Sequence, residues 1–296
     1  MTFKTRFAPS PTGPLHLGHA YSALVAHDMA IAHGGTFLLR IEDIDQARAR
    51  LEWETQIFDD LAWLGVRWPE AVMRQSQRQQ AYNQALDTLW ARGLLFACTC
   101  NRRDIFAAAQ APQEGAPLIG PDGIVYPGTC RDLHNATHAQ MPRPRNVALR
   151  LDMAAAVQAL QADQSARPLL EFSETGSGPN GETGQFDVHY DTLAETVGDV
   201  VLARRDMGTS YHLSVVLDDA EQGITHVVRG RDLFDATQIH VVLQGLLGLP
   251  KPVYHHHALI RDQAGKRLAK RDDARAIRKY RDDGCTPEDI RRMIGL

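Results

Sequence analysis

The sequence predicts an α/β protein built on a Rossmann-type parallel sheet with helices on both faces, split by an inserted domain. Two observations lead to this prediction. Short apolar strands alternate with amphipathic helices up to about residue 97 and again after about residue 190, whereas the stretch between is rich in turns. Alternating strands and helices are typical of parallel sheets, because each parallel neighbour needs a crossover connection. We therefore expect two halves of one core at 1–97 and 191–260, an insert at 98–190, and a loop with a short helical tail at 261–296.

Each element of the first half follows from the periodicity of its apolar residues. The expected elements are a strand at 3–8, a helix that ends at Gly34-Gly35, a strand at 36–41, and helices at 52–64 and 77–92. The first helix has its apolar residues on one stripe, and glycines follow both it and the last helix, as is usual for helix ends. The strand at 36–41 leads into the acidic cluster Glu42-Asp43-Ile44-Asp45.

The insert and the second half are predicted in the same way. Weak periodicity at 98–190 indicates short strands and loops, among them a glycine-rich loop at 176–184. Its G-x-G-x-x-G pattern contains Pro179 and lacks a strand–helix context, so it is not read as a nucleotide site. The later elements are a helix at 211–217, a strand at 224–228, a helix at 236–247, a strand at 253–260 and a helix opened by the capping box Thr286-Pro287-Glu288-Asp289. Three successive histidines at 255–257 alternate faces of a strand and cannot bind one metal together.

Composition and charge exclude several classes of protein. The 296 residues are 44% hydrophobic and 23% charged, which suits a folded protein with a sizeable core rather than a disordered tract. Four cysteines are too few for a disulfide scaffold, and no apolar run is long enough to span a membrane. We therefore expect a cytoplasmic monomer with no membrane partner. The net charge is −4, but residues 261–296 are basic, which suits a polyanion such as a nucleotide or RNA; a solvated surface of mixed charge stays an alternative.

The strongest functional motif is the run from Pro9 to His19, Pro-Ser-Pro-Thr-Gly-Pro-Leu-His-Leu-Gly-His, between the first strand and the first helix. His16 and His19 are three residues apart, so both imidazoles lie on one side of the helix start. The free N–H groups and the positive dipole end of a helix N-terminus favour phosphate, and Gly18 leaves room for a base or ribose. A pair of histidines alone is more often incidental, but this context predicts a nucleotide site.

This motif resembles the HIGH signature of class I aminoacyl-tRNA synthetases, in the form used by the glutamyl and glutaminyl branch. Further motifs of that family follow in the expected order: Arg40-Ile41-Glu42-Asp43, Tyr211-His212-Leu213, Val228-Arg229-Gly230-Arg231-Asp232 and, resembling the KMSKS signature, Gly265-Lys266-Arg267-Leu268-Ala269-Lys270-Arg271. The resemblance covers about residues 3–275. The last motif departs from the pattern, because Ala269 replaces serine and Arg267 the first lysine, while Lys270 keeps the cation.

The resemblance implies a function. About 25 residues follow the KMSKS-like loop, where full-length glutamyl-tRNA synthetases continue into an anticodon-binding region, so the chain is similar to a truncated paralogous family, the glutamyl-queuosine tRNA(Asp) synthetases. That family is a group of ligases that activate L-glutamate with ATP and Mg²⁺ and transfer it to the queuosine base in the anticodon of tRNA(Asp). Two alternatives stay open: a compact glutamyl-tRNA synthetase that charges a tRNA 3′ end, and a catalytically silent RNA-binding paralogue.

The resemblance also implies the site residues. It assigns catalysis to His16, His19 and Lys270, ATP binding to His16, Gly18, His19 and Lys270, and glutamate binding to Arg6, Phe7, Ala8, Pro9, Ser10, Glu42, Tyr211 and Arg229. The chemistry fits these roles, since a carboxylate pairs with the α-ammonium of an amino acid and an arginine holds a carboxylate by two parallel bonds. Each residue alone would pass for a surface charge or a core side chain.

Three cysteines predict a zinc site in the insert. Cys98, Cys100 and Cys130 would supply three thiolates of a closed tetrahedral centre, as structural zinc requires. Residue chemistry favours His134 as the fourth ligand, whereas the family pattern indicates Tyr126, which we adopt. The alternative is a set of ordinary buried thiols. Cys285 lies far away in sequence and is expected to be a plain thiol.

Overall fold

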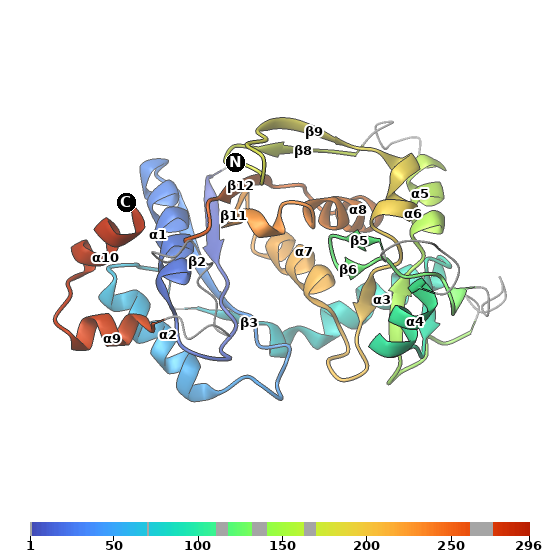
Figure 1. Cartoon of the computed structure of the whole chain (residues 1–296), viewed down its shortest axis with the longest axis horizontal. Coiled ribbons are helices and arrows are strands. Elements are labelled where there is room, and N and C mark those ends of the chain that lie inside the picture. Colours follow the sequence, from blue (N-terminus) through green and yellow to red (C-terminus); the bar gives the residue numbers. More distant parts are fainter. Residues whose placement is uncertain (1, 70, 111–117, 132–140, 163–169, 261–274) are drawn as a thin grey trace.

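The computed structural model describes residues 2–69, 71–110, 118–131, 141–162, 170–260 and 275–296 (Figure 1). Its helices are α1 (Leu17–Ala32), α2 (Leu51–Trp63), α3 (Gln79–Ala91), α4 (Arg102–Gln110), α5 (Met153–Ala162), α6 (Tyr190–Thr196), α7 (Tyr211–Glu221), α8 (Thr237–Leu247), α9 (Ile277–Asp282) and α10 (Pro287–Ile294), with 3₁₀ turns η1 (Gln75–Arg78) and η4 (Arg231–Leu233). Its strands are β1 (Lys4–Phe7), β2 (Thr36–Ile41), β3 (Met73–Arg74), β4 (Leu95–Cys98), β5 (Ile119–Gly120), β6 (Gly123–Ile124), β7 (Ala148–Leu151), β8 (Leu170–Glu174), β9 (Gly184–Val188), β10 (Val201–Ala203), β11 (His226–Gly230) and β12 (Val253–His257). Among these residues, no helix is long and apolar enough to cross a membrane.

A largely parallel layer forms the centre of the fold. One sheet has the order β1-β2-β3 with parallel neighbours, and a second has the order β11-β12-β8-β9, in which only β9 is antiparallel to its neighbour. The two meet edge to edge, because the Thr225 N–H donates to the Lys4 carbonyl at 3.0 Å and the Lys4 N–H donates to Thr225 Oγ1 at 2.8 Å. The predicted Rossmann-type parallel sheet is confirmed.

Alternate residues of each strand face helices on opposite sides of this layer. Phe37, Leu39 and Ile41 of β2 pack in one core with α1, whereas Leu38 between them packs against the other core, which includes α7 and α8. Since successive side chains of a strand point to opposite faces, a strand buried on both faces reads as a continuous apolar run. The expectation of helices on both faces is thereby met.

The middle of the chain is more helical than expected. Two helices, α4 and α5, lie where only short strands and loops were predicted. The α5 sequence Met-Ala-Ala-Ala-Val-Gln-Ala-Leu-Gln-Ala has high intrinsic helix propensity, but its many small side chains blur the amphipathic pattern. A third sheet, β10-β7-β4, is antiparallel and draws its strands from three of the predicted segments.

Strand pairing also crosses the expected boundary of the insert at residue 190. β8 and β9 come from the predicted insert, yet β8 pairs with β12 of the central layer. The division into 1–97, 98–190, 191–260 and 261–296 stays a prediction. The glycine-rich loop after β8 joins two antiparallel strands, so the structure agrees that no strand–helix phosphate loop lies there.

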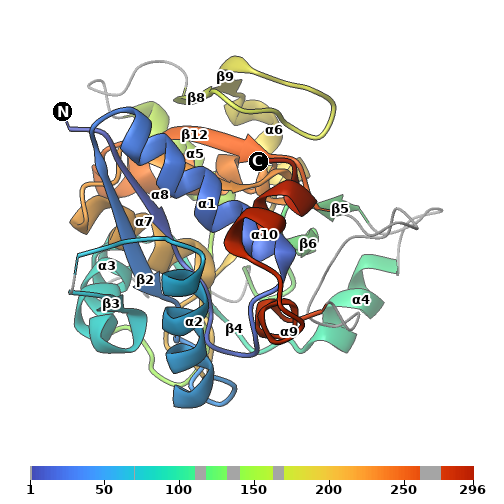
Figure 2. The same ribbon diagram turned by 90° about the vertical axis from the view of Figure 1, so that its left-hand side faces the viewer.

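The C-terminal helices return to the first helix. α10 begins with the predicted capping box, in which Thr286 Oγ1 accepts the Asp289 N–H at 3.2 Å. Ile290 and Ile294 are buried in the α1 core, and Arg291 pairs with Asp28 of α1 at 2.7 Å. This packing lays α10 beside α1 (Figure 2), and the Ile277 N–H at the start of α9 donates to the Leu15 carbonyl, just before α1, at 2.8 Å.

Replacing the buried carboxyl of Asp60, on α2, is expected to stabilise the fold by an amount that depends on pH. Burial raises the pKa of Asp60 to about 6. A carboxyl whose pKa is higher in the folded state destabilises that state when it is ionised. The destabilisation by Asp60 therefore grows as pH rises from about 4 through 6. We expect Asp60→Asn to raise the free energy of unfolding by about 1–2 kcal/mol at pH 8, and by less than half of that at pH 4.5.

Urea denaturation at the two pH values measures this effect. Asp59→Asn is the matched control, because its side chain is exposed and forms one surface pair with Arg281. That variant should change stability by less than about 0.5 kcal/mol at either pH. A gain for Asp60→Asn that did not depend on pH would contradict the assignment.

Candidate active site

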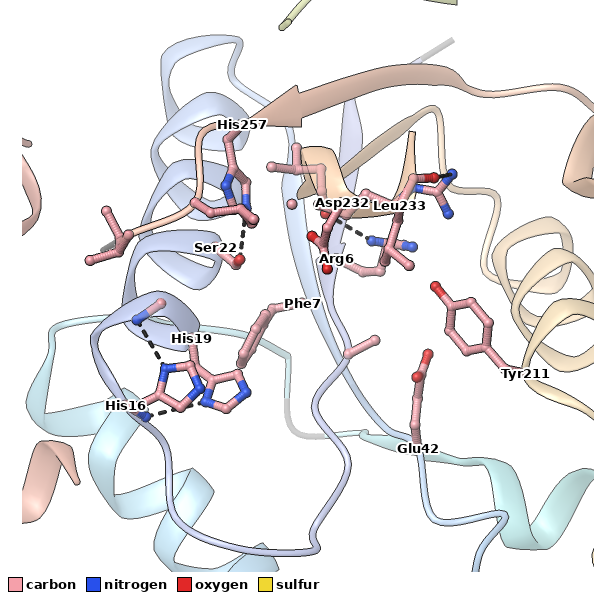
Figure 3. Close-up of a pocket in the computed structure, with 17 residues that line it drawn as sticks. Arg6, Phe7, His16, His19, Ser22, Glu42, Tyr211, Asp232, Leu233 and His257 are labelled. Carbon is pink, nitrogen blue, oxygen red and sulfur yellow. Dashed lines mark hydrogen bonds between the residues drawn. The ribbon is translucent and has the colours of Figure 1, made fainter. Parts of the chain in front are cut away.

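A cavity of about 570 Å³ opens at the carboxyl ends of β1, β2, β11 and β12 (Figure 3). In open α/β sheets this edge is where ligands bind. Nine of the predicted site residues line the cavity: Arg6, Phe7, Ala8, His16, Gly18, His19, Glu42, Tyr211 and Arg229. Pro9 and Ser10 do not line it, although the Pro9 carbonyl accepts the Glu42 N–H at 3.0 Å and so fixes the chain at Glu42. Lys270 lies outside the described residues.

The two histidines of the first motif cap helix α1. Nδ1 of His16 accepts the Gly18 N–H at 3.1 Å, and Nδ1 of His19 accepts the His16 N–H at 3.2 Å. Because each Nδ1 accepts a hydrogen bond, the neutral form of each ring carries its proton on Nε2. The rings stack with centroids 3.8 Å apart on one side of the helix start, as their spacing predicts. Their Nε2–H groups thus belong to a cluster at the positive end of the helix.

Gly18 makes room for the capping ring, and its predicted role beside a base or ribose stays a prediction. A Cβ at this position would lie 3.0 Å from Cε1 of His16. Glycine therefore lets the His16 imidazole fold over the first turn of the helix.

A buried network links Arg6 to Glu42 through a carboxylate of α7. Nε and Nη2 of Arg6 donate to the two oxygens of Asp219 at 2.9 and 3.3 Å, and Nη1 of Arg40 donates to Oδ1 at 2.6 Å. Nη2 of Arg40 then donates to Oε1 of Glu42 at 3.2 Å. Burial opposes ionisation of Asp219, but Arg6 and Arg40 together hold its pKa below the usual range. The network fixes Arg6 and Glu42 at the rim of the cavity.

Glu42 and Tyr211 come from different elements and lie side by side at the cavity (Figure 3). Burial raises the pKa of Glu42, against the pull of Arg40 and Arg6. A cationic ligand group would therefore be attracted to this carboxyl and would favour its ionised form. Tyr211 is the first residue of α7, after the N-cap Ser210, and burial raises the pKa of its hydroxyl. It stays protonated and can both donate and accept a hydrogen bond.

Arg229, on β11, is held by four hydrogen bonds. Nε donates to Nε2 of His256 and Nη1 to Nδ1 of His240, both at 3.0 Å. Nη2 donates to the Leu233 carbonyl at 3.1 Å and to Oγ1 of Thr237 at 2.8 Å. Of its five N–H groups, one on Nη1 is left for a ligand among the described residues. The predicted pair of parallel bonds to a carboxylate would require Arg229 to give up one of these protein bonds.

Sequence reasoning missed the residues that hold this site. Asp219, His240 and Glu174 lie in ordinary helix and strand contexts, and no motif distinguishes them. Ser22 and His257 also line the cavity, and their side chains are 2.7 Å apart. The only sequence feature that pointed to any of these residues was the run of three histidines from His255 to His257. It alternates faces as predicted: His256 contacts Arg229 on one side of the sheet, and His257 contacts α1 on the other.

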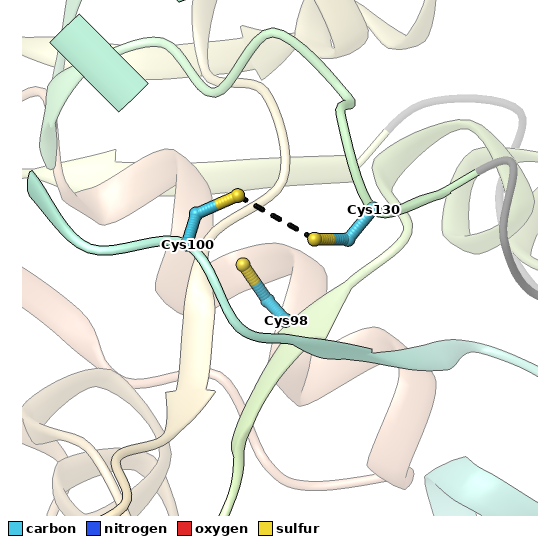
Figure 4. Close-up of side chains that lie close together, drawn as sticks. All are labelled: Cys98, Cys100 and Cys130. Carbon is cyan, nitrogen blue, oxygen red and sulfur yellow. Dashed lines mark hydrogen bonds between the residues drawn. The ribbon is translucent and has the colours of Figure 1, made fainter. Parts of the chain in front are cut away.

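The three predicted cysteines come together at the end of β4 (Figure 4). Their sulfur atoms lie within 4.8 Å of one another, and those of Cys100 and Cys130 are 3.4 Å apart. The hydroxyl of Tyr126 lies 3.5 Å from the sulfurs of both Cys98 and Cys100. The Cys130 N–H donates to this oxygen at 2.9 Å. His134 lies outside the described residues, and Cys285 is not part of the cluster.

Comparison with known proteins gives one consistent result. The catalytic-domain family of class I tRNA synthetases (E and Q) matches residues 2–296. The chain is 62% identical over 292 residues to the glutamyl-Q tRNA(Asp) synthetase of Rhodobacter capsulatus, covering 99% of each. It is 39% identical to that of Nocardia farcinica, over 98% of this chain and 82% of the relative.

Two solved structures share the fold. They are the glutamate-tRNA synthetase of Elizabethkingia anophelis, with a TM-score of 0.72 and 24% identity, and a glutamate tRNA ligase of Elizabethkingia meningosepticum in complex with its amino acid, with 0.70 and 25%. Each aligns over the whole of this chain, which spans 61% of their length.

Proposed function

The chain belongs to the class I tRNA synthetases of the glutamyl and glutaminyl type, and from this premise we propose that it activates L-glutamate with ATP and transfers the glutamate to the queuosine base in the anticodon of tRNA(Asp). Enzymes of this family use ATP, an amino acid and tRNA. The strongest support for the proposal is that a single cavity is lined both by charged groups suited to an amino acid, Glu42 and Arg229, and by the paired histidines at the N-terminus of α1. The similarity to glutamyl-Q tRNA(Asp) synthetases over nearly the full chain supports the choice of acceptor.

In the activation of glutamate by ATP, His16 and His19 would contact the phosphates. An oxygen of the glutamate α-carboxylate attacks the α-phosphorus of ATP, the bond to the β-phosphate oxygen breaks, and pyrophosphate leaves with the Mg²⁺ that accompanies the nucleotide. Such a transfer depends on positioning and on neutralising charge at phosphoryl oxygens. The Nε2–H groups of His16 and His19 and the N-terminus of α1 would supply these donors.

The residues proposed to bind the amino acid lie across the cavity from the two histidines (Figure 3). Glu42 would pair with the α-ammonium, Tyr211 would bond to the same end of the substrate, and Arg229 would bond to the side-chain carboxylate. Arg6 keeps two N–H groups outside its bonds to Asp219 and the Val228 carbonyl. It is the second candidate for a substrate carboxylate.

The cysteine cluster fits a structural zinc. In a tetrahedral centre with Zn–S of about 2.3 Å and Zn–O of about 2.0 Å, a ligand oxygen lies about 3.5 Å from each sulfur. The Tyr126 hydroxyl is at this distance from two of the three sulfurs. Cζ of Arg150 lies 3.9 Å from the centre of the tyrosine ring, and its charge would stabilise a phenolate. Cys98, Cys100, Tyr126 and Cys130 would hold the ion and tie β4 to the chain around residue 130.

Lys270 is tested by its effect on activation. The chain before and after the segment 261–274 can be placed relative to the cavity: Ile260 lines it, and Ala276 forms a backbone bridge with His16, which also lines it. We expect Lys270→Ala to reduce kcat/KM for adenylate formation, with a loss of about 2–4 kcal/mol in transition-state stabilisation. The KM for glutamate should change less. ATP–pyrophosphate exchange measures both, with Lys251→Ala, at an exposed position outside the cavity, as the control. An unchanged exchange rate would remove Lys270 from the mechanism.

The acceptor is tested by three transfer reactions with radiolabelled glutamate. We expect labelling of tRNA(Asp) that carries queuosine, and none of tRNA(Asp) without that base or of tRNA(Glu). Labelling of tRNA(Glu) at its 3′ end would instead indicate a compact glutamyl-tRNA synthetase. Absence of exchange with every amino acid would indicate a silent RNA-binding paralogue.

A further inference from the structure

We propose that His240 and His256 are positioning residues that hold Arg229 through neutral acceptors, so that its positive charge remains available to select the side-chain carboxylate of glutamate. This inference rests on the proposed glutamate activation. It assigns specificity to two histidines that bind Arg229 rather than the substrate.

His240 belongs to a directional chain of hydrogen bonds. Its Nδ1 accepts from Arg229, which always donates, so the neutral ring carries its proton on Nε2. That proton is donated to Nδ1 of His212 at 3.1 Å, and Nε2 of His212 then donates to Oδ1 of Asp122 at 3.3 Å. The chain therefore ends at a carboxylate, two imidazoles away from the guanidinium.

His256 forms a second chain of the same kind on the other side. Its Nε2 accepts from Arg229, so its proton lies on Nδ1 and is donated to the carboxylate of Glu174. The same carboxylate accepts the backbone N–H groups of His256 at 2.9 Å and Gly176 at 2.6 Å, which fixes its place. Both histidines are thus oriented by groups behind them, with an unprotonated nitrogen toward Arg229.

Burial keeps both rings neutral. His240 and His256 are 2% and 1% exposed. Burial, followed by the nearby charge of Arg229, lowers the pKa of His240 well below its usual value, and burial also lowers that of His256. Neither histidine therefore competes with Arg229 by carrying a charge of its own near neutral pH.

Arg6, the other arginine that lines the cavity, has partners of a different kind from those of Arg229. Arg6 is paired with the carboxylate of Asp219, which also pairs with Arg40. Arg229 has two imidazoles, a hydroxyl and a carbonyl as partners, and among the described residues no carboxylate bonds to it. Its guanidinium is fixed in direction without being neutralised.

A cation that no carboxylate contacts directly discriminates ligands by charge more than by shape. Arg229 is only 6% exposed, and among the described residues the carboxylates linked to it by hydrogen bonds lie beyond the imidazoles, so a carboxylate in direct contact would be favourable. The side-chain carboxylate of glutamate would make this contact when it binds, whereas the amide of glutamine supplies an acceptor oxygen but no charge. A carboxylate in place of a histidine would neutralise Arg229 in advance and would remove the advantage of glutamate.

The matched pair His240→Asn and His240→Asp tests the inference, because the two side chains have nearly the same shape and differ in charge. Asparagine keeps a neutral oxygen where Nδ1 accepts from Arg229. We expect His240→Asn to keep the KM for glutamate within about fivefold of wild type, and His240→Asp to raise it by at least about 30-fold. The preference for glutamate over glutamine in ATP–pyrophosphate exchange should fall in parallel, with the KM for ATP unchanged.

Thr237→Asn and Thr237→Asp form a second pair, at the other guanidinium nitrogen and in the first turn of α8, where a carboxylate suits the helix dipole. This pair preserves the test if a variant at position 240 does not fold. We expect the same order of effects. Equal loss of selectivity in the asparagine and aspartate variants, or wild-type selectivity in both, would overturn the proposal. Wild-type protein that activates no glutamate would instead overturn the proposed function.

Discussion

Replacing Asp219 by asparagine is expected to lower the free energy of unfolding by about 3–5 kcal/mol at neutral pH. The carboxylate is 7% exposed and is shared by Arg6 and Arg40. Asparagine leaves the buried guanidinium of Arg6 without its carboxylate partner and that of Arg40 with Glu42 alone, and its amide N–H groups would face the N–H donors of an arginine. Urea denaturation at pH 7 measures the loss.

The loss should depend on pH. Because the arginines hold the pKa of Asp219 below its usual range, its ionised form stabilises the fold above about pH 4, and this contribution disappears as pH falls through the folded-state pKa. The difference between wild type and Asp219→Asn should therefore shrink in acid.

Glu221→Gln is the matched control for Asp219→Asn. Glu221 lies two residues further along α7, where its side chain is largely exposed and 3.8 Å from Arg78. This variant should change stability by less than about 0.5 kcal/mol. Similar values for the two variants would show that the buried network is not held by Asp219.

Loss of zinc is expected to be the other large effect. Purified protein should hold about one zinc per chain, and Cys98→Ser should hold none, because a closed structural site needs all its ligands. Metal binding is coupled to folding, so the variant should lose the thermal stability of the region around β4 and residue 130. Metal analysis together with thermal unfolding, with and without a chelator, tests this.

Cysteine and tyrosine variants separate the alternatives. Cys285→Ser should keep the metal, because Cys285 lies outside the cluster. Tyr126→Phe should weaken zinc binding while His134→Ala leaves it unchanged, if tyrosine is the fourth ligand. Absence of zinc from protein prepared without chelator would support the alternative of ordinary buried thiols.

Sequence periodicity predicted the elements of the core well because their burial is regular. The strand at 36–41 and the capping box at Thr286 lie where they were expected, since an apolar strand and a cap are local patterns. Helix α5 was missed because its alanines satisfy helix propensity without an amphipathic stripe. The strand predicted at 224–228 lies two residues later, at β11, which shifts its carboxyl end to Gly230.

The sequence by itself indicated which residues could bind a nucleotide, an amino acid and a metal. The motif at His16 and His19 and the three cysteines indicate this by residue type and spacing, whereas Glu42 and Arg229 were indicated by the resemblance to class I synthetases. Only the tertiary structure decided how these groups are charged and aimed. Asp219 meets Arg6 from more than 200 residues away, and His240 and His256 meet Arg229 from a helix and a neighbouring strand. A chain of hydrogen bonds between separate elements leaves no periodic signal in the sequence, because its geometry exists only once the sheet and helices have packed.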